Sequence, residues 1–129
     1  MLGPRHGAAF AGLVACLSAG AAGAHDPLNP TPLTELRDAY YGEGVLEYCG
    51  LLTAESYDGF ERLVRHLLLT ARIDAETHRR IRIGGSVDAD YQFGNHGIGG
   101  QRLWCATDGR AAERKFLDFR RRQLAGGTG

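Results

Sequence analysis

The first 24 residues of the 129-residue chain determine which part of it can fold. A short start with the basic residue Arg5 precedes an uncharged, mostly apolar run over residues 8–22, and Ala22-Gly23-Ala24 follows. This order of basic, apolar and small-residue segments is typical of a secretory signal peptide. We therefore expect cleavage after Ala24, which assigns residues 1–24 to the signal and places the mature protein in the periplasm or outside the cell.

A second cleavage pattern lies inside the same segment. Leu13-Val14-Ala15-Cys16 has the form of a lipoprotein box, in which a lipidated Cys16 would become the new N-terminus. The apolar run continues beyond Cys16 to the Ala22-Gly23-Ala24 site, which favours ordinary cleavage. Attachment to a membrane is expected only if Cys16 is lipidated.

Two cysteines, Cys49 and Cys105, remain after either cleavage. An exported protein meets an oxidising compartment, where an even pair of cysteines is most simply a disulfide. Neither cysteine belongs to a Cys-x-x-Cys motif, which a thioredoxin-like redox site would require. The sequence therefore predicts a structural Cys49–Cys105 bridge.

The residue pattern of the mature chain favours an all-α fold. Apolar residues recur with helical spacing over residues 60–71, and no sustained alternation of apolar and polar residues predicts a strand. We expect a small bundle of about four helices stapled by one disulfide. An extended proline-rich arm over residues 25–33 precedes this single helical domain, residues 34–125, and a flexible tail over residues 126–129 follows it.

Helix boundaries are predicted from capping residues and glycines. Thr34 is expected to cap a first helix that runs to Leu52, and Asp74 to cap a helix over residues 75–83. The pair Gly84-Gly85 predicts the end of that helix, and Ser86 a cap for a further short one. The predicted elements after it are a glycine-rich loop over residues 94–100 and a last helix capped by Thr107 or Asp108.

Two ion pairs, Asp58–Arg62 and Glu61–Arg65, are expected along the second helix.

Composition and motifs exclude several function classes. Lysine plus arginine number 15, as do aspartate plus glutamate, and this balance does not indicate a general nucleic-acid binder. The glycine-rich stretch matches neither a dinucleotide fingerprint nor a Walker loop. Asp88 and Asp90 resemble the start of a calcium loop, but Phe93 and Gly99 stand where such a loop requires glycine and glutamate. No cofactor, metal ligand or catalytic residue is predicted.

One segment gathers the side chains expected of a binding surface. Polar and aromatic residues on loops are common in binding sites, and the glycines near residues 94–100 place several of them together. The candidate residues are Asp88, Asp90, Asn95, His96, Arg102 and Trp104, with Tyr91 beside them. The alternative interpretation is that Trp104 packs against the Cys49–Cys105 bridge and that His96 is merely exposed.

In size, export and a single long-range disulfide, the chain resembles small helical periplasmic proteins of the acid-stress chaperone kind. The resemblance covers no motif and assigns no residue a role. The function expected first is a non-enzymatic periplasmic or envelope protein that binds another envelope protein. The alternatives are a periplasmic stress chaperone and a small secreted hydrolase or metal-dependent enzyme.

Overall fold

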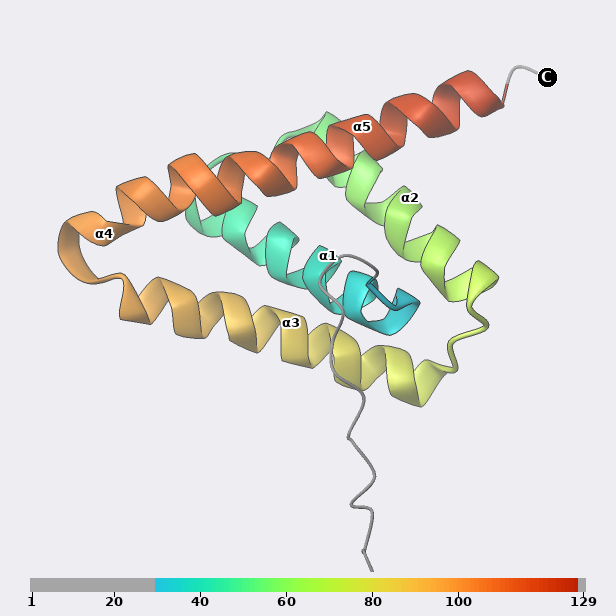
Figure 1. Ribbon diagram of the computed structural model, residues 1–129, viewed down its shortest axis with the longest axis horizontal. Helices are drawn as coiled ribbons and strands as arrows, with labels where there is room; N and C mark the ends of the chain where they lie inside the picture. The colour runs from blue at the N-terminus through green and yellow to red at the C-terminus, as the bar shows by residue number, and fades with distance from the viewer. Residues whose placement is uncertain (1–29, 128–129) are drawn as a thin grey trace, which may run out of the picture.

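The computed structural model describes residues 30–127, and within that range every regular element is helical. Three of these elements, α4, η1 and α5, follow one another without a break, so the chain forms four helical rods (Figure 1). The elements are α1 (Pro32–Tyr48), α2 (Ala54–Thr70), α3 (Ala75–Asn95), α4 (Gly97–Trp104), the π-helix η1 (Cys105–Gly109) and α5 (Arg110–Gly126). The predicted small all-α bundle is confirmed.

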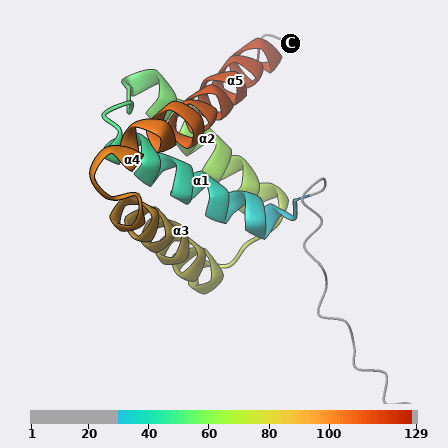
Figure 2. The ribbon, with the colours of Figure 1, turned by 60° about the vertical axis from the view of Figure 1, so that its left-hand side comes forward.

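Helix α1 occupies the middle of the bundle. Figures 1 and 2 show α3 along one side of α1, with α2 and α5 on the other side. Helix α4 turns the chain back from α3 towards α5 at the end of the molecule where α1 finishes. The most extensive helix–helix contacts are those of α1 with α3 and of α2 with α5.

Helix α2 has the clearest amphipathic pattern, and its predicted core face is confirmed. Phe60, Leu63, Val64 and Leu67 are buried, because their spacing puts them on one side of the helix. Thr53 and the Ser56 side chain form a reciprocal capping box at the N-terminus. This box satisfies backbone donors that a helix end otherwise leaves unpaired.

The two predicted ion pairs of α2 have different outcomes. Arg62 Nε donates to Asp58 at 3.0 Å, as expected. No ion pair joins Glu61 to Arg65 within the described part of the chain. Asp58 instead takes a second partner, because Arg120 of α5 donates to it at 2.8 Å.

Helix α3 corrects the expected break at Gly84-Gly85. Asp74 caps the helix as predicted, but the helix runs on unbroken to Asn95, and Ser86 lies in its interior rather than at a cap. A Cβ at Gly85 would lie 2.6 Å from the Arg37 carbonyl oxygen and 2.7 Å from the Tyr40 Cβ. The glycine therefore lets α3 approach the α1 backbone closely, and the tertiary contact overrides its low helix propensity.

The expected glycine-rich loop over residues 94–100 is also wrong for most of its length. Its first residues complete α3, and α4 begins at Gly97. Gly99 has φ of +96°, a conformation that glycine adopts without the steric penalty of a side chain. The glycines therefore make a tight reversal between helices, with little irregular chain.

Both ends of the helical region differ from the predicted caps. Thr31, not Thr34, caps α1, and Pro32 stands in its first turn, where proline's missing N–H is harmless. Helix α1 also ends earlier than predicted, at Tyr48. Neither Thr107 nor Asp108 caps the last helix, because the Thr107 hydroxyl donates to the Leu103 carbonyl and the chain is already helical there.

Two hydrophobic clusters form the core. The larger lies among α1, α2 and α5 and contains residues such as Leu36, Leu63 and Phe116. The smaller contains Val45, Ala89 and Trp104, and Cys49 and Cys105 pack beside it.

The predicted disulfide is confirmed. Cys49 and Cys105 are bonded, and their Cα atoms lie 5.5 Å apart. The bridge ties the end of α1 to the first residue of η1. A disulfide is compatible with an extracellular location.

The predicted signal peptide and Cys16 lie outside the described residues. Among residues 30–127, none of the helices combines the length and the apolar character needed to span a bilayer.

Candidate functional site

The structure separates the candidate residues that the sequence grouped together. Asp88 accepts hydrogen bonds from Arg37 of α1, the shorter at 2.7 Å, and Asp90 accepts one from the Tyr48 hydroxyl at 2.6 Å. Both aspartates therefore fasten α3 to α1. Asn95, at the end of α3, is exposed.

The remaining three candidates lie at the turn into α4. Arg102 is exposed, whereas Trp104 is buried with 3% of its surface accessible. The His96 ring stacks on Trp104 with centroids 5.2 Å apart. Trp104 belongs to the cluster beside the disulfide, as the alternative interpretation expected, and His96 is half-buried against it.

A polar chain runs through this cluster. The indole Nε1 of Trp104 donates to the Tyr41 hydroxyl at 3.0 Å, and that hydroxyl donates to Asp108 at 2.8 Å. Burial, together with the hydrogen bond to Asp108, raises the pKa of Tyr41 to about 12. Beside this chain lies a cavity of about 330 Å³, which His96, Leu103 and Trp104 help to line.

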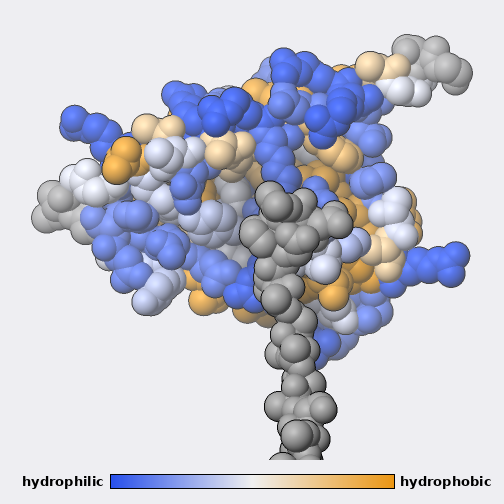
Figure 3. Space-filling model, in the orientation of Figure 1, coloured by the Kyte–Doolittle hydropathy of each residue, from blue (hydrophilic) through white to orange (hydrophobic). Residues whose placement is uncertain are grey.

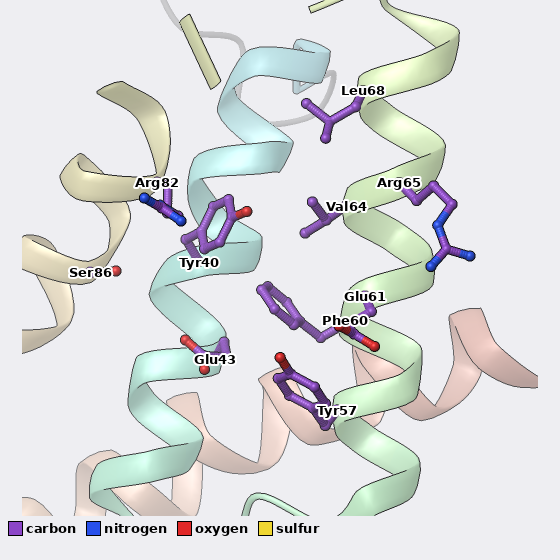
Figure 4. Close-up of a pocket in the computed structure, with 10 residues that line it drawn as sticks. All are labelled: Tyr40, Glu43, Tyr57, Phe60, Glu61, Val64, Arg65, Leu68, Arg82 and Ser86. Atoms are coloured by element: carbon purple, nitrogen blue, oxygen red, sulfur yellow. The ribbon is translucent and has the colours of Figure 1, made fainter. Parts of the chain in front are cut away.

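A larger groove lies among α1, α2 and α3, and we call it the central groove. Its volume is about 480 Å³, within the range of small-ligand sites (Figure 4). It is lined by Tyr40, Glu43, Tyr57, Phe60, Glu61, Val64, Arg65, Leu68, Arg82 and Ser86. Figure 4 shows α2 on one side, α3 on the other and α1 between them.

One wall of the central groove is apolar. Phe60, Val64 and Leu68 are four residues apart on α2 and therefore lie above one another on one side of the helix. The Tyr40 ring meets Phe60 edge to face, with centroids 5.4 Å apart. The Tyr40 hydroxyl is hydrogen-bonded to Nε2 of His78 at 2.7 Å, and burial raises the pKa of Tyr40. These contacts fix an aromatic surface on the floor of the groove.

The opposite part of the groove contains a half-buried carboxylate, that of Glu43. Burial, and to a lesser degree the charge of Glu47, raises the pKa of Glu43. No hydrogen bond or ion pair reaches this carboxylate from the described residues. Tyr57 lies nearby, and the charge of Glu61, followed by burial and Glu43, raises its pKa. This end of the groove is therefore short of positive charge.

The groove offers binding groups rather than an assembled catalytic set. Ser86 supplies a hydroxyl, but no hydrogen bond joins it to a histidine in residues 30–127. In the same range, no three histidine, cysteine, aspartate or glutamate side chains gather as a metal site would require. Apolar, acidic and basic side chains together suit recognition of an amphipathic ligand.

This groove could not be predicted from the sequence, because no local motif marks it. Glu43 comes between two glycines of α1, and Arg82 and Ser86 lie on either side of Gly84-Gly85, a pair that predicts a helix end. The apolar spacing of α2 was visible, but it indicated core only. The missing information was that α3 continues as one helix, which sets its Arg82 and Ser86 opposite α2.

No family model matches this chain, and the comparisons with curated proteins and with solved structures found no match.

Proposed function

We propose that this protein is an exported, non-enzymatic binding protein of the periplasm or the cell exterior. It holds a segment of another envelope protein in the central groove. The signal-like first 24 residues and the Cys49–Cys105 bridge support the location.

The single observation that carries the binding role is the pairing of Glu43 with an apolar wall. A half-buried carboxylate without a hydrogen-bonded cation has lost part of its hydration, so a ligand that supplies a cation gains from this site. Apolar groups of the same ligand would cover Phe60, Val64 and Leu68. A protein segment with a lysine or arginine beside apolar residues has both features.

The lining of the groove carries Arg65 and Arg82 as well as two glutamates, and it is the Glu43 end that favours a basic segment over an anionic one. Glu43 and Glu61 both line it, and Glu47 lies close enough to influence Glu43. Arg65 points away from the floor in Figure 4, on the outer side of α2. An anionic headgroup at the Glu43 end would meet like charge, whereas an ammonium or guanidinium group would meet opposite charge.

Fluorescence anisotropy with labelled model peptides tests this proposal. A peptide of leucines and lysines should bind with a micromolar dissociation constant, and its leucine–glutamate counterpart should not. Glu43→Gln should weaken the leucine–lysine peptide about tenfold, as expected for a desolvated charge pair. Glu55→Gln, an exposed carboxylate outside the groove, is the matched control and should bind as wild type. Equal binding by wild type and Glu43→Gln would contradict the proposal.

A stress chaperone is the second candidate function, and the contacts of Asp58 favour it. Asp58 joins α2 to α5 through Arg120 and also holds Arg62. The hydrogen bonds from Arg62 and Arg120 lower the pKa of Asp58. A lowered pKa gives stability that is present above the unfolded-state value and is lost as the pH falls through the folded-state value. Acid should therefore loosen the α2–α5 pair and expose apolar surface.

An apolar-surface dye measures this loosening. Dye fluorescence should rise at low pH in wild type, and Asp58→Asn should show part of that rise at neutral pH. Asp118→Asn is the control, because Asp118 pairs with Arg121 within α5. A chaperone role is rejected if acid leaves dye binding unchanged.

A further inference from the structure

The outer side of α3 carries three large apolar residues that no described element covers. Ile83, Val87 and Tyr91 are 52%, 55% and 67% exposed. They are four residues apart, so they form one stripe along the helix. In Figures 1 and 2, α3 forms the lower edge of the molecule, and Figure 3 shows patches of apolar surface along that edge.

This arrangement differs from the usual one for a surface helix. The fully buried residues of α3 are the small Gly85 and Ala89, and its large residues Ile81 and Phe93 pack against the core only partly buried. An ordinary surface helix buries its large apolar residues and exposes its polar ones. Within residues 30–127 nothing covers the stripe, and an aligned exposed patch of this kind is typical of an interaction surface.

The two ends of the stripe carry complementary groups in a self-complementary order. Arg79 and Asp90 are eleven residues apart, which is close to three helical turns, so they lie along the same edge of the stripe. Arg80 and Tyr91, the last residue of the stripe, are also eleven residues apart and share the other edge. Both arginines lie before Ile83, whereas Asp90 and Tyr91 lie beyond Val87.

We propose that two copies of the protein pair through these outer faces, with the two α3 helices antiparallel. A two-fold axis at the level of Gly85, perpendicular to both helices, makes the partner's α3 run in the opposite direction. Each edge of the stripe then faces the same edge of the partner's stripe. Ile83 then packs on the partner's Val87. Arg79 faces the partner's Asp90, and Arg80 lies over the partner's Tyr91 in a cation–π contact. Symmetry makes each contact occur twice.

The groups now bound to these charges leave room for the new contacts. Arg79 uses Nε and Nη2 on Glu76, the shortest of these bonds being 3.0 Å, and its Nη1 makes none of them. Asp90 accepts the Tyr48 hydroxyl on Oδ1, which leaves Oδ2 available. Among the described residues, the Arg80 guanidinium makes one long contact of 3.5 Å, to the Thr77 hydroxyl.

The size of the surface sets the expected strength. Stable interfaces bury roughly 800 Å² on each partner. A single helix of 21 residues is about 31 Å long and offers less than that. The dimer should therefore form in the micromolar range. The inference does not rest on the central groove, because Arg82 and Ser86 line that groove from a different side of α3.

Sedimentation velocity over a concentration series of about 1 to 500 μM tests the pairing. Wild type should pass from monomer to dimer over this range. Val87→Arg should remain a monomer, because each dimer would bury two unpaired charges in the stripe. Leu69→Arg is the matched control: Leu69 is 72% exposed on α2, so this variant should dimerise like wild type. Circular dichroism confirms that each variant is folded.

Charge reversal tests the antiparallel order. Arg79→Glu and Asp90→Arg should each raise the dimer dissociation constant about tenfold, because each places like charges opposite one another twice. The double variant Arg79→Glu/Asp90→Arg should return the constant to near the wild-type value. A parallel pairing predicts no such restoration, since each position would face its own copy.

Several results would overturn this inference. They are a monomer at every concentration, a dimer that Val87→Arg leaves intact, and a double variant that stays as weak as the single ones. The basic residues near the stripe suggest one competing occupant, an anionic membrane. If wild type stays monomeric yet sediments with phosphatidylglycerol vesicles and Val87→Arg does not, the stripe is a lipid-binding face and self-pairing is rejected.

Discussion

Helices α2 and α3 both pack in the bundle with α1, but they do so in opposite ways. Helix α2 buries large side chains, among them Phe60 and Leu63, whereas the buried residues of α3 are Gly85 and Ala89. Polar contacts, such as Arg37 with Asp88, then hold the edges of α3. Because α3 packs by close backbone approach, with only Ile81 and Phe93 partly buried against the core, Ile83, Val87 and Tyr91 remain on its outer side. Apolar periodicity therefore predicts the buried side of a helix such as α2 but not that of a helix such as α3.

The largest expected effect comes from removing the disulfide beside the small α1–α3 cluster. Chain-entropy arguments give a closure of this length about 4 kcal/mol of stability. The variant Cys49→Ser/Cys105→Ser should lose about that much, as measured by urea denaturation. Hydrogen exchange should show α3 losing protection before α2, because few large side chains hold α3. Equal loss of protection in both helices would break the comparison.

The next largest effect is expected from truncating a large side chain, which should distinguish α2 from α3. Leu63→Ala removes a side chain that is almost fully buried in the main cluster and should cost about 3 kcal/mol. Val87→Ala removes apolar atoms from the outer side of α3 and should change monomer stability by less than about 0.5 kcal/mol. Thermal unfolding of dilute protein measures both. Similar losses from the two variants would show that α3 uses its large side chains after all.

Enlarging a small residue gives the converse experiment on α3. Gly85→Ala forces a methyl group against the α1 backbone and should cost about 2 kcal/mol, despite alanine's better helix propensity. Gly94→Ala is the control, since a Cβ there meets nothing within 4 Å. It should be neutral or stabilise by up to about 1 kcal/mol. Stabilisation by both variants would refute close packing at Gly85.

The smallest expected effect is a loss of stability at alkaline pH, which acts through the polar contacts of Tyr41. The pKa of Tyr41 is about 12, above its ordinary value of 10. The unfolded chain therefore ionises first, so stability is complete below pH 10 and declines as the pH rises towards 12. Trp104 is the single tryptophan and donates to Tyr41, so its fluorescence reports the change. Tyr41→Phe should reduce this dependence to the part that comes from Tyr40, Tyr48 and Tyr57, whose pKa values are also raised, and an undiminished dependence would assign it to those groups.

The same contrast explains which parts of the fold could be predicted. The core face of α2, the Asp74 cap and the Cys49–Cys105 bridge depend on local spacing or on counting, and all three predictions are confirmed. The break at Gly84-Gly85 was wrong because glycine's low propensity is a local property, whereas its contact with Arg37 and Tyr40 is tertiary.

The predicted binding surface shows a related limit. Asp88 and Trp104 were grouped because they are close in sequence, but Asp88 faces Arg37 and Trp104 is buried beside the disulfide. The central groove draws Glu43, Val64 and Arg82 from three helices, and no sequence pattern joins them. These residues are close because three helices pack together, and local sequence does not specify how those helices cross.

The bridge also closes part of the polypeptide into a covalent ring. Residues 49–105 form a closed ring that contains all of α2 and α3, and the segments carrying α1 and α5 leave the ring at the bridge. Arg72 is exposed in the short α2–α3 connection, with φ of +51°. A trypsin-like cut after Arg72 therefore opens the ring without dividing the molecule. The two pieces separate on a gel only after reduction, so a nicked protein keeps its apparent mass where disulfides persist.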